Sequence, residues 1–221
     1  SLPSGRMRIT HLGHSCLLLE MADTRILLDP GVFTPDLAPA TDLAAIVVTH
    51  QHPDHLDISR LPGLLAANPG ALLLTDPETA QIVRGLGYDV LAQDGTTRAI
   101  GAVTLRPVGE KHALINEDIP IIANVGVVVT ADGEPTLYHP GDTLAEDPGA
   151  VDIACVPLNA PWQRSREMTG YLRRLAAPRA VPIHDGLLND NGRGLYLSQA
   201  RTLGCADTEI VDLAGAGPRD L

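Results

Sequence analysis

Short apolar segments of strand length recur along the chain and are separated by turn residues. Apolar runs of this length, bounded by Gly, Pro, Asn and Asp, are typical of β-strands. Asp23-Thr24 and Ala131-Asp132-Gly133 have the composition of hairpin turns, so the strands on either side of each turn are predicted to be antiparallel neighbours. The predicted strands cover residues 8–12, 16–20, 25–28, 44–49, 71–75, 102–107, 121–130, 136–138, 153–156, 180–183 and 209–213.

Helical patterns are fewer than strand patterns. The clearest covers residues 77–86, where Asp76 is placed to cap the first turn and Pro77 occupies the first helical position. Further helices are predicted over residues 166–176, 193–203 and 56–67, the last of them interrupted by proline. Because strands alternate with helices in both halves of the chain, the pattern predicts an α/β fold in which two packed sheets are flanked by helices.

Length and composition limit the architecture further. A chain of 221 residues can bury a sizeable core, and no linker, repeat or low-complexity segment marks a boundary, so we expect one domain over residues 7–221. Residues 1–6 lack the apolar core of a signal peptide and are interpreted as a leader or an expression remnant. The longest apolar stretch contains Pro120 and Asn124 and is too short to cross a bilayer, so stable membrane insertion is not expected.

Charge and cysteine content narrow the partners and the compartment. The net charge of -11 and the lack of a Lys/Arg cluster interleaved with aromatic residues argue against nucleic acid as a partner. The three cysteines are an odd number, and Cys16 and Cys155 lie in apolar runs. We therefore expect a cytoplasmic protein without disulfide bonds. A homo-oligomer stays possible, because no interface can be recognised in a single sequence.

Three of the eight histidines lie in one short stretch, Val-Val-Thr-His-Gln-His-Pro-Asp-His, which follows a predicted strand. His50 and His52 are two positions apart, so in extended backbone their imidazoles lie on the same side and can share one metal ion. Asp54 and His55 follow a proline, where the chain turns, and can reach a neighbouring ion. A structural zinc site closes with four ligands that commonly include thiolates, and this stretch has no cysteine. The pattern therefore favours a catalytic metal site.

The stretch Thr49-His50-Gln51-His52-Pro53-Asp54-His55 resembles the H-x-H-x-D-H signature of the metallo-beta-lactamase superfamily. Further segments resemble motifs of that family and occur in the family's order: Leu-Leu-Asp-Pro-Gly at 27–31, Pro-Val-Gly-Glu-Lys-His at 107–112, Tyr-His-Pro-Gly-Asp-Thr at 138–143 and Ala-Val-Pro-Ile-His-Asp-Gly at 180–186. The resemblance covers nearly the whole chain from Met7 onward. It implies a four-layer αββα sandwich of two mixed β-sheets flanked by helices.

The resemblance also implies two metal ions and a ligand set. By metal, the residues are His50, His52 and His112 for the first ion, Asp54, His55 and His184 for the second, and Asp142 as the bridge. Each of these ligands follows an apolar run, so strand ends can bring them to one edge of a sandwich. Ligands rich in imidazole and free of thiolate suit zinc, with manganese or iron as alternatives. Two ions that share a water lower its pKa from about 16 toward about 7, and Asp54 and Asp142 would orient the resulting hydroxide.

Other polar residues have more than one interpretation. His139 is expected to be catalytic, either by supporting the metal ligands or by facing the substrate. His14, in a Gly-His-Ser pattern that recurs in the branch this chain most resembles, could approach the site, whereas His11 is interpreted as structural. Asp29 and Asp185 could each accept the second N–H of a metal-bound histidine, or could be turn aspartates.

The branch most resembled is the compact group of metal-dependent hydrolases that includes ascorbate-6-phosphate lactonase-like and N-acylphosphatidylethanolamine phospholipase-like proteins. The expected activity is hydrolysis of an ester, lactone, thioester or phosphoester of a small molecule by a metal-bridging hydroxide. Trp162 is expected either to pack or to recognise the substrate, and Arg164 and Arg166 either to lie on the surface or to hold a phosphate or carboxylate. The loops expected to contact the substrate are residues 32–39, 110–120 and 159–166.

Two other classes of function stay open. The fold could serve as a non-catalytic or regulatory metal-binding module, which predicts the loss of one or more ligands, whereas every ligand has a candidate here. Alternatively, an iron site with an electron donor could support redox chemistry. A carboxylate in place of His52 would favour the redox alternative, and the sequence has histidine.

Overall fold

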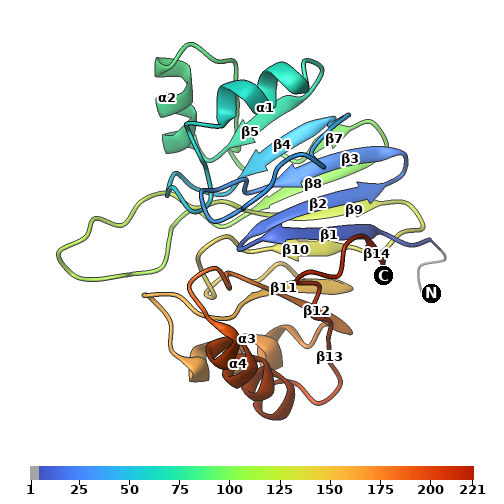
Figure 1. The fold of residues 1–221 in the computed structure, drawn as a ribbon, viewed down its shortest axis with the longest axis vertical. Coiled ribbons are helices and arrows are strands. Elements are labelled where there is room, and N and C mark those ends of the chain that lie inside the picture. Colours follow the sequence, from blue (N-terminus) through green and yellow to red (C-terminus); the bar gives the residue numbers. More distant parts are fainter. Residues whose placement is uncertain (1–4) are drawn as a thin grey trace.

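The computed structural model describes residues 5–221, so the first four residues of the expected leader or remnant lie outside the described residues. Within that range two seven-stranded sheets pack face to face, and helices cover both outer faces (Figure 1). Helices α1 (Leu61–Ala67) and α2 (Pro77–Gly85) cover the first sheet, whereas α3 (Ser165–Leu175) and α4 (Asp190–Leu203) cover the second. The mixed α/β sandwich that the sequence predicts is therefore confirmed.

The first sheet is built from both ends of the described chain. Its strands in spatial order are β14 (Arg219–Asp220), β1 (Arg8–Gly13), β2 (Cys16–Met21), β3 (Thr24–Leu28), β4 (Ala45–Val48), β5 (Leu72–Thr75) and β6 (Leu91–Ala92). β1 to β3 are antiparallel neighbours, and β3 to β6 continue as parallel strands. Ala22 and Asp23 form the turn between β2 and β3, one residue earlier than predicted. Both have positive φ, as a two-residue hairpin turn of this kind requires.

The second sheet brings several strand ends to one edge. Its strands in spatial order are β13 (Glu209–Ile210), β12 (Arg179–Ile183), β11 (Ile153–Pro157), β10 (Leu137–His139), β9 (Gly126–Ala131), β8 (Val103–Val108) and β7 (Arg98–Ile100). β8 and β10 are both antiparallel to β9, and β10 to β12 are parallel. The loops that follow β8, β10, β11 and β12 therefore leave the sheet on the same side.

Three apolar clusters fill the spaces between the four layers. Between the sheets, Leu19 of β2 belongs to the same cluster as Val129 of β9. The outer face of the first sheet packs on α1 and α2 through residues such as Leu61, and that of the second sheet packs on α3 and α4 through residues such as Met168. Because both faces of each sheet are covered, central strands are apolar at successive positions, and every residue of β4 is buried.

The apolar run over residues 121–130 forms a strand only from Gly126 onward. Its first part contains Asn124, which is fully buried. The Asn124 side-chain amide donates to the Pro140 carbonyl, and its side-chain oxygen accepts from the Asp142 backbone amide. The polar contacts of this residue therefore bind residues 121–125 to the loop after β10 instead of extending the strand.

Helix boundaries differ from the apolar pattern where polar side chains intervene. α1 is shorter than the predicted 56–67, because the Asp57 carboxylate binds the Arg60 guanidinium at 2.6 Å in a turn that precedes the helix. α4 begins earlier than predicted, because the Asn189 side chain caps it by accepting from the Gly192 amide. The apolar pattern does not predict β6, β7 and β14, because strands of two or three residues have no periodic signal.

α2 follows the sequence prediction. Its cap is Asp76, whose carboxylate accepts from the backbone amides of Glu78 and Thr79. None of the helices between residues 5 and 221 has both the length and the apolar character needed to cross a bilayer. Cys16, Cys155 and Cys205 are all free thiols, which agrees with the expected absence of disulfides in the described chain.

Candidate metal centre

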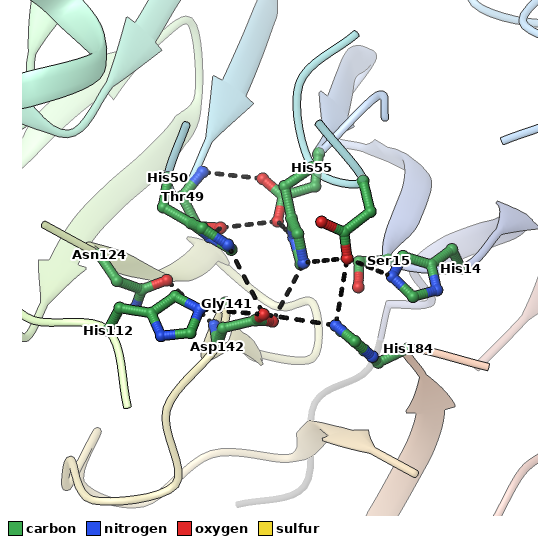
Figure 2. Close-up of polar contacts among 12 residues, drawn as sticks. His14, Ser15, Thr49, His50, His55, His112, Asn124, Gly141, Asp142 and His184 are labelled. Atoms are coloured by element: carbon green, nitrogen blue, oxygen red, sulfur yellow. Dashed lines mark hydrogen bonds and ion pairs between the residues drawn. The ribbon is translucent and has the colours of Figure 1, made fainter. Parts of the chain in front are cut away.

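The residues assigned to metal binding lie together where strands of both sheets end (Figure 2). The first group, in which one potential ligand atom from each residue lies within 4.8 Å of the others, consists of His50, His52, His112 and Asp142. The second group consists of His14, Asp54, His55 and His184. This division matches the two-ion assignment made from the sequence, and His14 joins the second group.

Asp142 lies between the two groups (Figure 2). Its Oδ2 is 3.2 Å from His112 Nε2 of the first group and 3.3 Å from His184 Nε2 of the second, and its Oδ1 is 3.1 Å from His55 Nε2. The backbone conformation of the preceding residue, Gly141, positions this carboxylate. Gly141 has φ 63°, and a Cβ on it would lie 2.3 Å from Asn124 Oδ1, so a larger residue would displace the loop. The geometry therefore places one carboxylate in contact with histidines of both groups.

Asp29, at the end of β3, braces the loop that carries the histidine cluster. Its carboxylate is fully buried and accepts from the Thr49 amide at 2.8 Å and from the Thr49 hydroxyl at 2.7 Å. It also accepts from His55 Nδ1 at 2.7 Å. Two residues later, a Cβ on Gly31 would lie 1.9 Å from the Asp54 carbonyl oxygen, so the loop packs directly on this glycine. Of the two roles that the sequence left open, Asp29 has the histidine-orienting one.

Each buried imidazole at the centre uses Nδ1 for an outer hydrogen bond, which leaves Nε2 facing inward. The Nδ1 acceptors are Thr49 Oγ1 for His50 (3.0 Å), Asp29 Oδ2 for His55 (2.7 Å), the Ala113 carbonyl for His112 (2.6 Å) and the Asn159 carbonyl for His184 (2.6 Å). Thr49 Oγ1 can accept because its own hydrogen is donated to Asp29. Hydrogen bonds of this kind fix the tautomer and the ring orientation of metal-binding histidines.

Several inward-facing atoms have no hydrogen-bond partner within the described residues. They are buried, and they are His50 Nε2, His55 Nε2, His184 Nε2 and Asp142 Oδ1. Buried polar atoms are rarely left unpaired, because each lost hydrogen bond costs about 1–3 kcal/mol. These atoms face one another with lone pairs, and imidazole nitrogen and carboxylate oxygen are the donors that divalent transition metals take. The donor set therefore fits divalent metal ions.

The pKa shifts at the centre show that the two aspartate carboxylates stabilise positive charge on the histidines around them. Burial lowers the pKa of His184, but the carboxylates of Asp142 and Asp54 outweigh it and raise the pKa to about 9. Burial likewise opposes protonation of His55, and Asp142 overcomes it and holds that pKa well above its usual value. Burial would raise the pKa of Asp142, yet the surrounding imidazoles hold it well below its usual range. Both carboxylates are therefore ionised at neutral pH, and cations are attracted to the space between them.

His14 supports Asp54. Its Nδ1 accepts from the Gly186 amide at 3.0 Å, so the neutral ring carries its hydrogen on Nε2 and donates it to Asp54 Oδ2 at 2.8 Å. Burial lowers the pKa of His14, which favours this neutral form. With both ring nitrogens used in this way, His14 positions a carboxylate of the second group rather than offering a lone pair to a metal.

Two residues lie elsewhere than one interpretation of the sequence suggests. His139 is fully buried, donates from Nε2 to the Ser15 carbonyl at 2.9 Å and accepts at Nδ1 from the Gly141 amide, so neither ring nitrogen is left for a substrate. The geometry favours its supporting role over a substrate-facing one. Asp185 does not contact the His184 ring; its carboxylate binds the Arg193 guanidinium at 3.1 Å.

A cavity of about 310 Å³ opens beside the two groups. Its lining residues are Val32, Phe33, His52, Pro53, Asp54, His112, Ile115, Asp142, Pro161, Trp162, His184 and Leu187. All three loops that were expected to contact the substrate contribute residues to the cavity wall. Leu187 also lines the wall, and no sequence pattern had singled it out. Trp162 donates its indole N–H to Asp142 Oδ2 at 3.1 Å. Arg164 and Arg166 do not line the cavity, and Arg164 binds Glu167 on the surface instead.

Comparisons with known proteins agree with this arrangement. A family profile described as "Beta-lactamase superfamily domain" matches residues 8–184. Protein Rv0786c of Mycobacterium tuberculosis is 41% identical over 207 residues, which cover 93% of this chain and 96% of that protein. A UPF0173 metal-dependent hydrolase of Methanospirillum hungatei is 31% identical over 191 residues, which cover 80% and 82% of the two chains.

The fold is also similar to that of a solved structure. The metallo-beta-lactamase fold protein YhfI from Bacillus subtilis superposes with a TM-score of 0.72 at 18% identity, covering 94% of this chain and 96% of YhfI. The profile covers most of the chain, and the relatives span most of its length. The chain therefore belongs to the metallo-beta-lactamase superfamily, among its metal-dependent hydrolases.

Proposed function

We propose that this protein is a dinuclear metal-dependent hydrolase of a small molecule. The observation that carries the proposal is the set of buried, inward-facing Nε2 atoms without hydrogen-bond partners, arranged in two groups on either side of Asp142. His50, His52 and His112 would hold one ion, Asp54, His55 and His184 the other, and Asp142 would contact both. When bound, two such ions supply Lewis acidity and a nucleophilic hydroxide at neutral pH.

The protein's own residues orient the reaction. Asp54 lines the cavity with its side chain 21% exposed, so its carboxylate can accept a hydrogen bond from an attacking water. His14 fixes the rotamer of Asp54 by donating a hydrogen bond to its Oδ2 atom. Trp162 lines the cavity and fixes Asp142 Oδ2 through its indole N–H. Together these contacts keep both carboxylates ionised and aimed at the space where water and substrate would meet.

Ester, lactone, thioester and phosphoester bonds are the candidates for cleavage, because water attacks each of them at an electrophilic carbon or phosphorus. Zinc is the metal we propose, with manganese or iron(II) as alternatives, since imidazole and carboxylate ligands suit all three. Buried free thiols at Cys16 and Cys155 support a cytoplasmic location. The alternative is a non-catalytic metal-binding module, which the open cavity beside the site disfavours.

The test is metal content per chain, measured by plasma mass spectrometry on protein purified without chelator, together with ester and lactone hydrolysis. We expect about two ions per chain and activity that is lost on chelation and regained with zinc. His50→Ala should lose metal and activity. Gln51→Ala is the matched control, because Gln51 lies in the same loop and its side chain binds Glu78 on the surface. Protein that takes up no zinc, manganese or iron would overturn the proposal.

A further inference from the structure

The cavity beside the metal centre has a wall with an unusual composition. Of its lining residues, five belong to the two groups at the centre, and every other one is apolar. The apolar wall comes from loops far apart in the sequence and includes Val32, Phe33, Ile115, Trp162 and Leu187. The indole N–H of Trp162 is already donated to Asp142. Outside the metal centre, the described residues of the wall therefore offer a substrate almost no hydrogen bond.

The wall is also exposed, which is uncommon for large apolar side chains that stand close together. Phe33 is 41% exposed, Val32 46% and Leu187 51%. Exposed apolar patches mark surfaces that bind ligands or partners, because removing apolar surface from water is favourable. These three side chains lie at the opening of a cavity that leads to the metal centre, so the apolar group they would cover belongs to the substrate.

The basic side chains nearest to the cavity line a neighbouring hollow instead of the cavity itself. Lys111 and Arg174 line a separate hollow beyond His112 and Trp162, together with the acidic residues Glu146 and Glu167. The Arg174 guanidinium donates to the Leu144 and Glu146 carbonyls. Across the described chain, no lysine or arginine lines the cavity itself.

The overall charge of the protein also disfavours anionic substrates. The chain carries a net charge of -11, which repels anions as they approach. An anionic substituent in the cavity would lose its hydration and gain no cationic partner outside the metal centre, which makes its transfer from water unfavourable. A phosphate or carboxylate far from the scissile bond is therefore strongly disfavoured.

We infer that the substrate is a small carboxylic ester, thioester or lactone with an apolar chain, and that it has no phosphate or carboxylate remote from the bond that is cleaved. This inference rests on the proposed function and narrows it. For an ester, the oxygen of water bonds to the carbonyl carbon and the acyl C–O bond breaks. The alkoxide takes one proton of the water and leaves as the alcohol, the other proton passes to solvent, and the acid is released as a carboxylate.

Trp162 provides a binding assay that does not depend on turnover, because it is the only tryptophan in the chain. Its fluorescence would be followed while metal-loaded protein is titrated with hexanamide, a neutral probe, or with adipamate, which has the same chain with a carboxylate at the far end. We expect hexanamide to bind at least about tenfold more tightly than adipamate. Equal or tighter binding of adipamate, or no response to hexanamide at millimolar concentration, would overturn the inference.

A charge-gain variant sharpens the test. Leu187→Lys places a cation at the cavity opening and should tighten adipamate binding by about tenfold while weakening hexanamide. Leu195→Lys is the matched control, because Leu195 is 56% exposed on α4 and does not line the cavity. Both probes should bind this control as they bind the parent protein. A Leu187→Lys variant that behaves like the control would also overturn the inference.

Hydrolysis of a matched pair, ethyl hexanoate and monoethyl adipate, separates this inference from the proposed function. Preferred cleavage of ethyl hexanoate supports both. Cleavage of monoethyl adipate at an equal or higher kcat/KM leaves the proposed hydrolase in place and overturns the substrate class. Preferential binding of hexanamide by protein that holds no metal and cleaves neither ester supports the apolar ligand class and overturns the hydrolase.

Discussion

The two groups of side chains at the centre differ in how they carry charge. In the first group, burial lowers the pKa of His50 well below its usual value and also lowers that of His52. In the second, burial acts in the same direction, but the carboxylates of Asp142 and Asp54 outweigh it and raise the pKa of His184 to about 9. At neutral pH the imidazoles of His50 and His52 are therefore neutral, whereas the second group holds protons that a metal ion must displace.

The difference arises because Asp142 raises the pKa values of His55 and His184 most strongly and Asp54 adds a second carboxylate beside them. Asp54 lies 3.3 Å from His55 Nε2 and 3.4 Å from His184 Nε2, and it is held by His14. A carboxylate attracts a divalent cation, but it attracts a proton to its neighbours as well. Two halves of one site, built from the same residue types, can therefore differ in metal affinity and in their response to pH.

The largest effect is expected for Asp142→Asn, which removes the charge shared by both groups. The amide keeps the shape of the side chain but cannot offer an anionic oxygen to each side. We expect at least about a 10³-fold loss of kcat/KM and a metal content of about one ion or less. Activity assays and metal analysis would measure this, with circular dichroism to verify the fold. An active variant that retains both ions would show that Asp142 does not bridge.

His14→Ala should affect only the second group. Loss of the Nε2–H donor frees the Asp54 side chain, and removal of such outer partners typically weakens metal affinity or activity by about 10- to 100-fold. Metal titration should show weaker binding of one ion and unchanged binding of the other. His14→Gln retains a side-chain N–H and should recover part of the loss. Equal weakening of both ions would contradict the separation of the two groups.

The two groups should also respond differently to pH. The pKa of His184 is raised to about 9, so below that pH the metal-free second group holds a proton that an incoming ion must release. Because the pKa of His55 is raised as well, affinity for the second ion should rise at least about tenfold per pH unit from neutrality toward pH 9. The first group, whose His50 and His52 pKa values are lowered, should bind with little pH dependence above neutrality. Chelator competition across this range would measure both affinities, and parallel slopes would refute the difference.

Trp162→Phe should have the smallest effect, and it should be the same for both groups. The variant keeps most of the ring but removes the N–H that binds Asp142 Oδ2, the oxygen that lies beside His112 of the first group and His184 of the second. We expect about a 3- to 10-fold fall in kcat/KM, because the hydrogen bond is partly exposed to solvent. Metal content should stay at the parent level. A loss confined to one ion would show that the indole acts on one side only.

The sequence singled out the proposed metal ligands because each of them is marked locally. The cluster at residues 47–55 is contiguous, and His112, Asp142 and His184 each follow a predicted strand. His14 had a weaker signal, a Gly-His-Ser pattern from which the sequence suggested only that it could approach the site. Asp185 is adjacent to His184 in the sequence and was a candidate acceptor for the second N–H of a metal-bound histidine. In the structure, His184 Nδ1 instead donates to the Asn159 carbonyl. The partner of a side chain is chosen by what packs beside it, which adjacency in the chain does not reveal.

The cavity shows the same limit. Trp162 and Arg164 are two residues apart, but Trp162 lies over the metal centre whereas Arg164, at the start of α3, binds Glu167 on the surface. Sequence alone left two roles open for each, packing or substrate recognition for Trp162 and a surface position or an anion contact for Arg164. Leu187 is far from the other wall residues in the sequence and was not singled out, because an apolar residue in a loop has no distinguishing mark.

The sequence by itself determined the alternation of strands and helices, the order of the motifs and the residue types available to bind metal. These follow from local preferences and from the apolar faces that each element must bury. Only the tertiary structure decided that Asp142 faces both groups, that His14 donates to Asp54 and that the cavity wall is apolar. Those features depend on distances between residues far apart in the chain, and the packing of the two sheets sets these distances.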